Sequence, residues 1–398
     1  MYKVTNLDHY GRGIIKLNNK TTFVENALPN EVIDIKITHE YKNFNEAKVV
    51  NYIETSNERC EIKCPYYNEC GGCNIMHMSY EAQLDFKQNK IKNIVDKYLN
   101  NNIKINKIIS YNNQFNYRNK ITFKVKDNKI GFYKNNTHEI VEINKCLIAN
   151  EKINEIISYL KKLDLSLITN ITCRCNNGLM VIIDTNSYNL NVDFLKPVAT
   201  SIYFKINNKL KHIYGDKNIY EKLEKYNYII SPNSFFQVNK NITIKLYNKI
   251  KEYVGKGKNV LDLYCGTGSI GIFINDENNV VGIEINESAI KDATKNKDLN
   301  KLDNTHFILG DSGKKIKELK FKPDVIIIDP PRSGLNNETL NNILDFNSKK
   351  IIYVSCDPMT LVRDLKLLNN LYNIQEITPF DMFPNTYHVE CIALLNIK

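Results

Sequence analysis

The sequence predicts a multidomain protein with a small, OB-like N-terminal β-barrel, a central β-rich α+β domain and a C-terminal Rossmann-like α/β domain. Its 398 residues are too many for one ordinary hydrophobic core. Short strands separated by turns occupy the first 57 residues. From about residue 231, near-continuous apolar strands alternate with helical stretches, as in a buried parallel sheet. We therefore place the domains at residues 1–58, 59–230 and 231–398.

Composition and charge narrow the class of protein. Hydrophobic content of 42% and charged content of 25% are ordinary for a soluble globular protein. There is no apolar run of the roughly 20 residues that a membrane span needs and no signal peptide, so we expect a cytoplasmic protein without membrane contact. The net charge of +10 suits nucleic acid, although a solvated lysine-rich surface would give the same value.

The N-terminal region has the pattern of a small barrel. Strand-like stretches occur at residues 11–17, 22–24, 32–37 and 47–50. A compact basic barrel of this length is a common module for holding RNA, and a purely structural β cap is the alternative.

Ten cysteines without an export signal favour metal-binding or catalytic thiols over disulfides. Cys64, Cys70 and Cys73 fall within ten residues, and the two glycines before Cys73 permit a tight turn. Cys146 is the obvious fourth ligand, and Cys60 could compete for that place. Four thiolates suit tetrahedral zinc or a [4Fe–4S] cluster, and the spacing does not decide between them.

A helix and a set of strands follow the cysteines. The helix is expected over residues 80–99, where it could pack on the C-terminal domain, and Lys87 shares the spacing of its apolar residues. An Asn-Asn-Gly turn at 176–178 is a strong hairpin signal. The strands predicted in the central domain are residues 120–126, 129–133, 171–175 and 179–183.

The C-terminal domain carries a glycine-rich loop after its first strand. Its strands are expected at residues 259–263, 280–284, 306–309, 324–329 and 351–355, with a last strand over 389–395. Gly266 and Gly268 let the backbone approach a ligand, and ligands of open α/β sheets bind at the carboxyl ends of strands. Glu284 could accept both ribose hydroxyls, and Asp311 could contact an adenine. This pattern fits S-adenosylmethionine but leaves a dinucleotide open.

Asp329-Pro330-Pro331-Arg332 after the fourth strand is typical of methyltransferases that act on a planar base. Amino-methylation of adenine would explain this tetrapeptide but not Cys356 and Glu390, which lie further along the chain.

Cys356, in Ser-Cys-Asp-Pro, and Glu390, in His-Val-Glu, point to chemistry at a carbon that has no lone pair. A thiolate that adds to C6 of uracil turns C5 into a nucleophile for the methyl group. A base must then remove the C5 proton so that the thiol can leave. A buried structural cysteine is the alternative reading of Cys356.

Taken together, these motifs resemble those of the RNA (uracil-5-)-methyltransferase family, particularly the members that make 5-methyluridine in 23S rRNA. The resemblance covers essentially the whole chain. It includes a TRAM-like barrel, the four cysteines, residues 234–239, the glycine-rich loop, and the Asp-Pro-Pro-Arg, Ser-Cys-Asp-Pro and His-Val-Glu motifs. It implies a class I methyltransferase domain at the C-terminus.

The resemblance also implies a role for individual residues. Cys356 would be the nucleophile and Glu390 the base, whereas Arg118 matches a stretch of the RNA-facing central domain. The four cysteines would hold a [4Fe–4S] cluster that shapes fold and RNA binding. The residues implied to bind S-adenosylmethionine are Gln237, Tyr264, Gly266, Gly268, Ser269, Glu284, Asp311 and Asp329.

The resemblance favours 23S rRNA over tRNA, because tRNA-modifying relatives generally lack both the barrel and the cluster. The target base would be flipped out of its stack to reach the thiol. We expect a monomer. The alternatives are the same chemistry on a tRNA T-loop uridine, amino-methylation of a nucleobase, and a non-enzymatic iron–sulfur RNA-binding protein.

Overall fold

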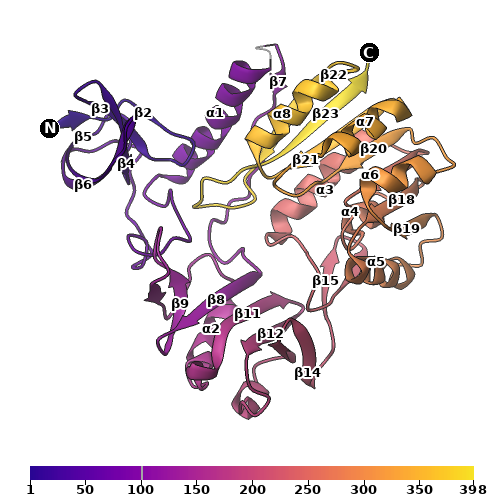
Figure 1. Ribbon diagram of the computed structural model, residues 1–398, viewed down its shortest axis with the longest axis horizontal. Helices are drawn as coiled ribbons and strands as arrows, with labels where there is room; N and C mark the ends of the chain where they lie inside the picture. Colours follow the sequence, from indigo (N-terminus) through magenta and orange to yellow (C-terminus); the bar gives the residue numbers. More distant parts are fainter. Residues whose placement is uncertain (100–101) are drawn as a thin grey trace.

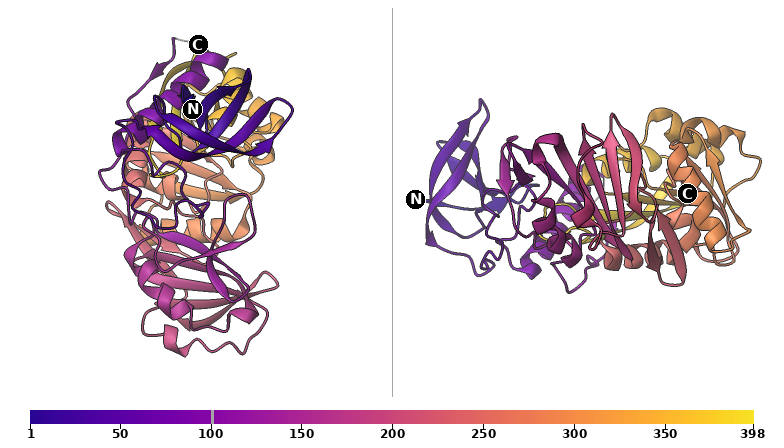
Figure 2. Two further views of the ribbon diagram at one scale, coloured as in Figure 1. Left: turned by 90° about the vertical axis from the view of Figure 1, so that its left-hand side faces the viewer. Right: turned by 90° about the horizontal axis from the view of Figure 1, so that it is seen from below.

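The computed structural model describes residues 1–99 and 102–398. The N-terminal sheet lies at one end of the molecule, the C-terminal sheet lies at the other, and the central sheet forms a third lobe (Figures 1 and 2). Helix α1 (Tyr80–Tyr98) leaves the N-terminal lobe and packs beside α8 (Pro358–Leu368) of the C-terminal lobe (Figure 1). No helix within the two described ranges is long and apolar enough to cross a membrane.

The N-terminal lobe is a six-stranded sheet around its own small core, with strand order β1-β5-β6-β4-β3-β2. Side chains alternate between this core and solvent, which places Ile15, Val24 and Ile33 inside. Its strands are β1 (Tyr2–Lys3), β2 (Asn6–Leu7), β3 (Gly13–Leu17), β4 (Lys20–Glu25), β5 (Val32–Glu40) and β6 (Phe44–Glu54). The four stretches predicted as strands are confirmed as β3 to β6.

The central lobe is a seven-stranded sheet with one helix against it. The apolar face of α2 (Glu151–Leu160) is buried on the sheet through Ile153, Ile156 and Ile157. The predicted hairpin is confirmed: Asn176 pairs with Gly178, whose φ of +126° an L side chain rarely adopts. In sheet order, the strands are β10 (Ile140–Glu142), β9 (Lys129–Tyr133), β8 (Lys120–Lys126), β11 (Ile168–Asn176), β12 (Gly178–Thr185), β13 (Ser201–Ile206) and β14 (Lys209–Gly215).

The C-terminal lobe is an eight-stranded sheet with strand order β19-β18-β17-β20-β21-β23-β22-β7. The five strands predicted before residue 356 are confirmed as a parallel set. They are β17 (Asn259–Leu263), β18 (Asn279–Glu284), β19 (Thr305–Leu309), β20 (Val325–Ile328) and β21 (Lys350–Ser355). The helices of this lobe are α3 (Lys240–Val254), α4 (Ser269–Phe273), α5 (Glu287–Leu299), α6 (Ser312–Lys315), α7 (Asn337–Phe346) and α8.

One edge of this sheet departs from the predicted parallel arrangement. The last strand, β23 (Glu390–Ile397), runs antiparallel to β21, and β22 (Tyr372–Phe380) runs antiparallel to β23. The short β7 (Lys104–Ile105), from far upstream in the chain, adds to β22. β22 escaped prediction because polar residues interrupt the apolar pattern of this near-edge strand.

Two segments upstream of residue 231 pack into the C-terminal core. The hairpin β15 (Ile219–Leu223) and β16 (Tyr226–Ile230) buries its apolar side chains there. Helix α1 does the same with Ile91, Ile94 and Val95. Three short 3-10 turns complete the described structure: Leu165–Leu167, Asp193–Leu195 and Ile316–Glu318.

Candidate active site

The register of β21 and β23 brings the two predicted catalytic residues together. Ser355 pairs with Cys391, so the next position along each strand places Cys356 opposite Glu390. Directly after Cys356, the Asp357 carboxylate caps α8 by accepting the Thr360 N–H at 2.8 Å. The thiol is only partly buried, whereas Glu390 is 3% exposed. Two residues that are distant in sequence therefore lie side by side at the end of the sheet.

Arg332 connects this pair to solvent. Burial and then the charge of Glu390 raise the pKa of Cys356 to about 11, although the charge of Arg332 and its hydrogen bond to the sulfur oppose the rise. Burial and then Asp329 raise the pKa of Glu390 well above its ordinary value, and Arg332 again opposes. Both shifts favour the protonated form of the thiol and of the carboxyl group.

Further carboxylates lie at the ends of β17 and β20. Burial raises the pKa of Asp329 to about 7. Burial, followed by the charge of Asp329, raises the pKa of Asp262 to about 8. Asp262 Oδ2 accepts the Gly271 N–H at 3.2 Å, but Oδ1 has no hydrogen-bond partner among the described residues. This acidic, poorly hydrated surface suits a cationic ligand.

The glycine-rich loop leaves room beside these carboxylates. Gly266 has φ of +55°, and a Cβ built on it would meet nothing within 4 Å. A Cβ on Gly268 would instead lie 2.3 Å from the Phe307 ring, so this glycine serves packing. Tyr264 holds φ of +61°, a left-handed conformation that is strained for a side chain of this size.

Glu284 is anchored at the end of β18 by the loops on either side. Its Oε2 accepts the Gly266 N–H at 3.2 Å, and its Oε1 accepts the Asn286 N–H at 2.8 Å. Each carboxylate oxygen keeps a free lone pair, so Glu284 can accept further hydrogen bonds from a diol.

The remaining predicted cofactor residues have other partners in this structure. Ser269 Oγ lies 2.7 Å from the Tyr247 hydroxyl. Asp311 caps α6, and its side chain accepts the Lys314 N–H at 3.2 Å. Gln237 is buried.

The four predicted metal ligands line one cavity of about 510 Å³, namely Cys64, Cys70, Cys73 and Cys146. Burial raises the pKa of Cys146 to about 11 and that of Cys73 well above its ordinary value. Cys60 does not line this cavity and is exposed, with its sulfur 3.4 Å from the Met76 carbonyl. Across residues 1–99 and 102–398, no three acidic, His or Cys side chains form a group that could hold a metal ion. The metal cluster therefore stays a prediction, although the chemistry of the donor set fits one.

Sequence reasoning missed a buried polar junction five residues before Glu390. Asn385, 1% exposed and with φ of +67°, donates its N–H to Gln83 Oε1 at 2.8 Å. Its carbonyl accepts the N–H groups of Asn74 and Ile75 at 3.0 and 3.2 Å. Helix α1, the cysteine-rich segment and the chain that leads to Glu390 thus meet at one residue. An asparagine in a loop gives no sequence signal of such a role.

Sequence reasoning also missed a buried ion pair, although one of its two residues stands out in the sequence. Lys87 is fully buried, pairs with Asp381, which is also fully buried, and donates to the Phe383 carbonyl at 3.0 Å. A lysine within the apolar stripe of α1 was the signal, because burying that charge requires a partner.

Comparison with known proteins gives a consistent result. The family model described as tRNA (Uracil-5-)-methyltransferase matches residues 185–398, and the TRAM domain model matches residues 3–50. An uncharacterized RNA methyltransferase of Staphylococcus aureus (strain MRSA252) is 36% identical over 440 residues, which cover 99% of this chain and 97% of that protein. One from Clostridium acetobutylicum is 35% identical over 439 residues and covers 98% and 95%.

Among solved structures, the chain is similar to the Pyrococcus abyssi tRNA (uracil-54, C5)-methyltransferase in complex with S-adenosyl-L-homocysteine. The TM-score is 0.81 at 27% identity, over 99% of this chain and 100% of that one. The predicted N-terminal TRAM domain and C-terminal class I methyltransferase fold are confirmed.

Proposed function

This chain belongs to the tRNA (uracil-5-)-methyltransferase family, and on that premise we propose that it methylates C5 of a uridine in RNA through Cys356 and Glu390. The observation that carries the proposal is the strand register that sets these two residues opposite each other beside Arg332. Amino-methylation of a base would use neither a thiol nor a second carboxyl at this place.

The charges at the site suggest an order for the proton transfers. Cys356 and Glu390 repel each other when both are ionised, so forming the thiolate favours a protonated Glu390. Arg332 stabilises the thiolate that adds to C6 of uracil. The addition makes the sulfur a neutral thioether, which removes one negative charge next to Glu390 and lowers the pKa of its carboxyl.

Glu390 then becomes the base. S-adenosylmethionine, when bound, supplies an electrophilic methyl group, and C5 carries both that methyl group and its original proton after transfer. An ionised Glu390 removes the proton, the C5–C6 double bond re-forms, and Cys356 leaves as a thiolate. The methyl group ends on C5, the C5 proton on Glu390 and the C6–S electron pair on Cys356, while the protons first lost from the thiol and from Glu390 pass to solvent.

An RNA fragment with 5-fluorouridine at the target position tests this chemistry directly. Fluorine at C5 cannot leave as a proton, so the enzyme, incubated with S-adenosylmethionine, should remain bound as an adduct that survives a denaturing gel. The adduct should be absent from Cys356→Ala. If RNA and cofactor bind but no adduct forms, the covalent mechanism is wrong.

We propose that the residues that bind S-adenosylmethionine are Gln237, Tyr264, Gly266, Gly268, Ser269, Glu284, Asp311 and Asp329. The open space at Gly266 and the unpartnered Oδ1 of Asp262 support a ligand here. Glu284→Gln should raise the Kd for S-adenosylhomocysteine by roughly tenfold or more, because it weakens charge-assisted hydrogen bonds. Exposed Glu287→Gln is the matched control in calorimetry. Equal Kd values for both variants would remove Glu284 from the site.

For the RNA we propose 23S rRNA, on the resemblance carried by the barrel and the four cysteines together. The barrel alone no longer supports this choice, because the match to the archaeal tRNA enzyme spans 99% of this chain. That match favours a tRNA T-loop uridine as the second candidate. Methyl transfer to unmodified 23S rRNA fragments and to an unmodified tRNA transcript, assayed side by side, decides between them.

We further propose that Cys64, Cys70, Cys73 and Cys146 hold a [4Fe–4S] cluster, supported by their shared cavity. Anaerobically purified protein should contain iron and acid-labile sulfide and absorb visible light. Cys146→Ser should lose both, whereas Cys60→Ser should keep them. Zinc without sulfide would replace this proposal with a zinc site.

A further inference from the structure

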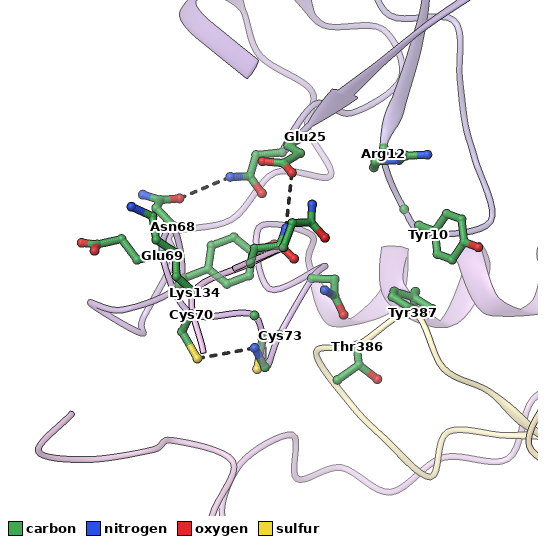
Figure 3. Close-up of a pocket in the computed structure, with 18 of the residues that line it drawn as sticks. Tyr10, Arg12, Glu25, Asn68, Glu69, Cys70, Cys73, Lys134, Thr386 and Tyr387 are labelled. Carbon is green, nitrogen blue, oxygen red and sulfur yellow. Dashed lines mark hydrogen bonds between the residues drawn. The ribbon is translucent and has the colours of Figure 1, made fainter. Parts of the chain in front are cut away.

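A second cavity, of about 520 Å³, lies where the N-terminal barrel faces the loop before Glu390. We call it the barrel cleft. Tyr10 and Tyr387 stand on one side of it and Cys70 and Lys134 on the other (Figure 3). Arg332 also lines it. Because Arg332 also interacts with the Cys356 thiol, the barrel cleft shares one residue with the surroundings of the proposed catalytic pair.

Tyr10 is an exposed aromatic residue on a rigid turn. Its side chain is 54% exposed, yet the Asp8 carboxylate accepts the N–H groups of Tyr10 and Arg12 at 2.9 and 2.8 Å. Gly11, with φ of +80°, packs so closely that a Cβ there would lie 2.5 Å from Ile75. The Arg12 guanidinium lies 5.4 Å from the centre of the Tyr10 ring. Such an aromatic ring is already ordered for stacking, at little further cost in entropy.

A second aromatic group lies beside Tyr10 on the same side of the barrel cleft. The Tyr387 ring meets the Tyr10 ring edge to face at 5.2 Å and lies 4.4 Å from the His388 ring. Lys90 fixes this side by donating to the Tyr387 carbonyl at 3.0 Å. Two lobes of the protein thus contribute one aromatic surface next to the catalytic loop.

The charge of the barrel cleft favours an anion. Lys48 and Lys134 pair with carboxylates, and so does Arg12. Arg118 and Arg332 form no ion pair within the described part of the chain. Burial lowers the pKa of His388 to about 4, with the nearby charges of Arg332, Lys90, Lys87 and Arg118 adding to the effect. Glu25, Glu46 and Glu69 also line the barrel cleft, but its five arginine and lysine residues outnumber these three carboxylates, so its net charge is positive.

We propose that the barrel cleft binds the nucleotide next to the methylated uridine, with its base stacked on the Tyr10 ring beside Tyr387 and its phosphate facing Arg118 and Arg332. Aromatic stacking combined with cations along the backbone is the general means of holding single-stranded RNA. The site keeps the target strand unpaired beside the pair that acts on the flipped base. The inference rests on the proposed function for its substrate but concerns binding alone.

The test uses the full-length protein and an oligouridylate probe with 2-aminopurine on each side of one uridine. Stacking quenches 2-aminopurine, so fluorescence should fall on binding to the wild type. Tyr10→Ala should lose most of the quenching and raise the Kd at least tenfold, equivalent to about 1.4 kcal/mol. Tyr10→Phe should stay within about twofold of wild type, because its ring still stacks.

Tyr188→Ala is the matched control, because Tyr188 is 57% exposed and also has a cation, Lys211, over its ring. It should bind as wild type does. Equal loss in Tyr188→Ala or in Tyr10→Phe, or none in Tyr10→Ala, overturns the stacking site.

Arg118→Gln gives an independent measurement. It should reduce the slope of log Kd against log salt concentration by about 0.7, the value for one contact with a single-stranded phosphate. An unchanged slope removes the phosphate contact. Because none of these readouts needs methyl transfer, quenching without any 5-fluorouridine adduct would refute the catalytic proposal and leave the barrel cleft standing.

Discussion

The ends of the C-terminal strands gather carboxyl groups, whereas the barrel cleft has a net positive charge, although the two regions share Arg332. Asp262, Asp329 and Glu390 crowd the first region, and burial raises the pKa of each carboxyl. The second presents two arginines without a carboxylate partner in the described chain. Carboxyl groups with raised pKa values suit proton transfer and a cationic cofactor, whereas a polyanion needs the reverse. The comparison teaches that adjacent regions of one site serve different tasks: carboxyl groups at the strand ends suit the chemistry, and arginines in the barrel cleft suit RNA binding.

Removing the nucleophile should give the largest effect and confine it to the first region. Cys356→Ala should lower methyl transfer by several orders of magnitude, because no other group can add to C6. The Kd for S-adenosylhomocysteine and for RNA should stay unchanged. Transfer of a labelled methyl group measures the activity, and calorimetry measures the Kd values. Buried Cys173→Ala is the control. An active Cys356→Ala variant would contradict the covalent mechanism.

Glu390→Gln should stop the reaction before its last step, the removal of the C5 proton. Addition and methylation proceed, but the C5 proton stays, so turnover should fall by about 10²- to 10⁴-fold. A methylated protein–RNA adduct should accumulate on a denaturing gel with ordinary uridine. Normal release of product would assign the base to another residue.

Lys87→Met tests the loop that joins the two regions. It leaves Asp381 buried without its cation, which should cost about 3–5 kcal/mol of the free energy of unfolding. Urea unfolding measures the loss, with exposed Lys92→Met as control. Adding Asp381→Asn should recover part of it, and a double variant as unstable as the single one would show that the pair is not the cause.

The smallest effect concerns the pH dependence of stability. The folded-state pKa of Asp262, about 8, lies above its ordinary value of 3.8, so its contribution is favourable below pH 4 and is lost as pH rises toward 8. Asp262→Asn should therefore raise Tm more at pH 8 than at pH 5, relative to wild type without ligand. An equal shift at both values would mean that Asp262 does not titrate in this range.

Sequence patterns predicted the site best where regular strands build it. The motifs around Cys356 and Glu390 lie at strand ends, and sheet geometry then fixes their neighbours. The cleft between lobes gave no such pattern: Tyr10 is one of 24 tyrosines in the chain, and nothing local distinguishes it. Lys87 lies between these cases, because its place in an apolar stripe indicated a partner without identifying Asp381.

The sequence alone determined the family, the parallel strands of the C-terminal sheet and the chemistry that its side chains allow, because these depend on local pattern and residue type. Tertiary structure decided that β23 runs antiparallel beside β21 and sets Glu390 against Cys356. It also decided that Asn385 joins three segments and that Tyr10 meets Tyr387 across two lobes. These contacts join residues far apart in the chain, and only packing of the whole molecule brings such residues together.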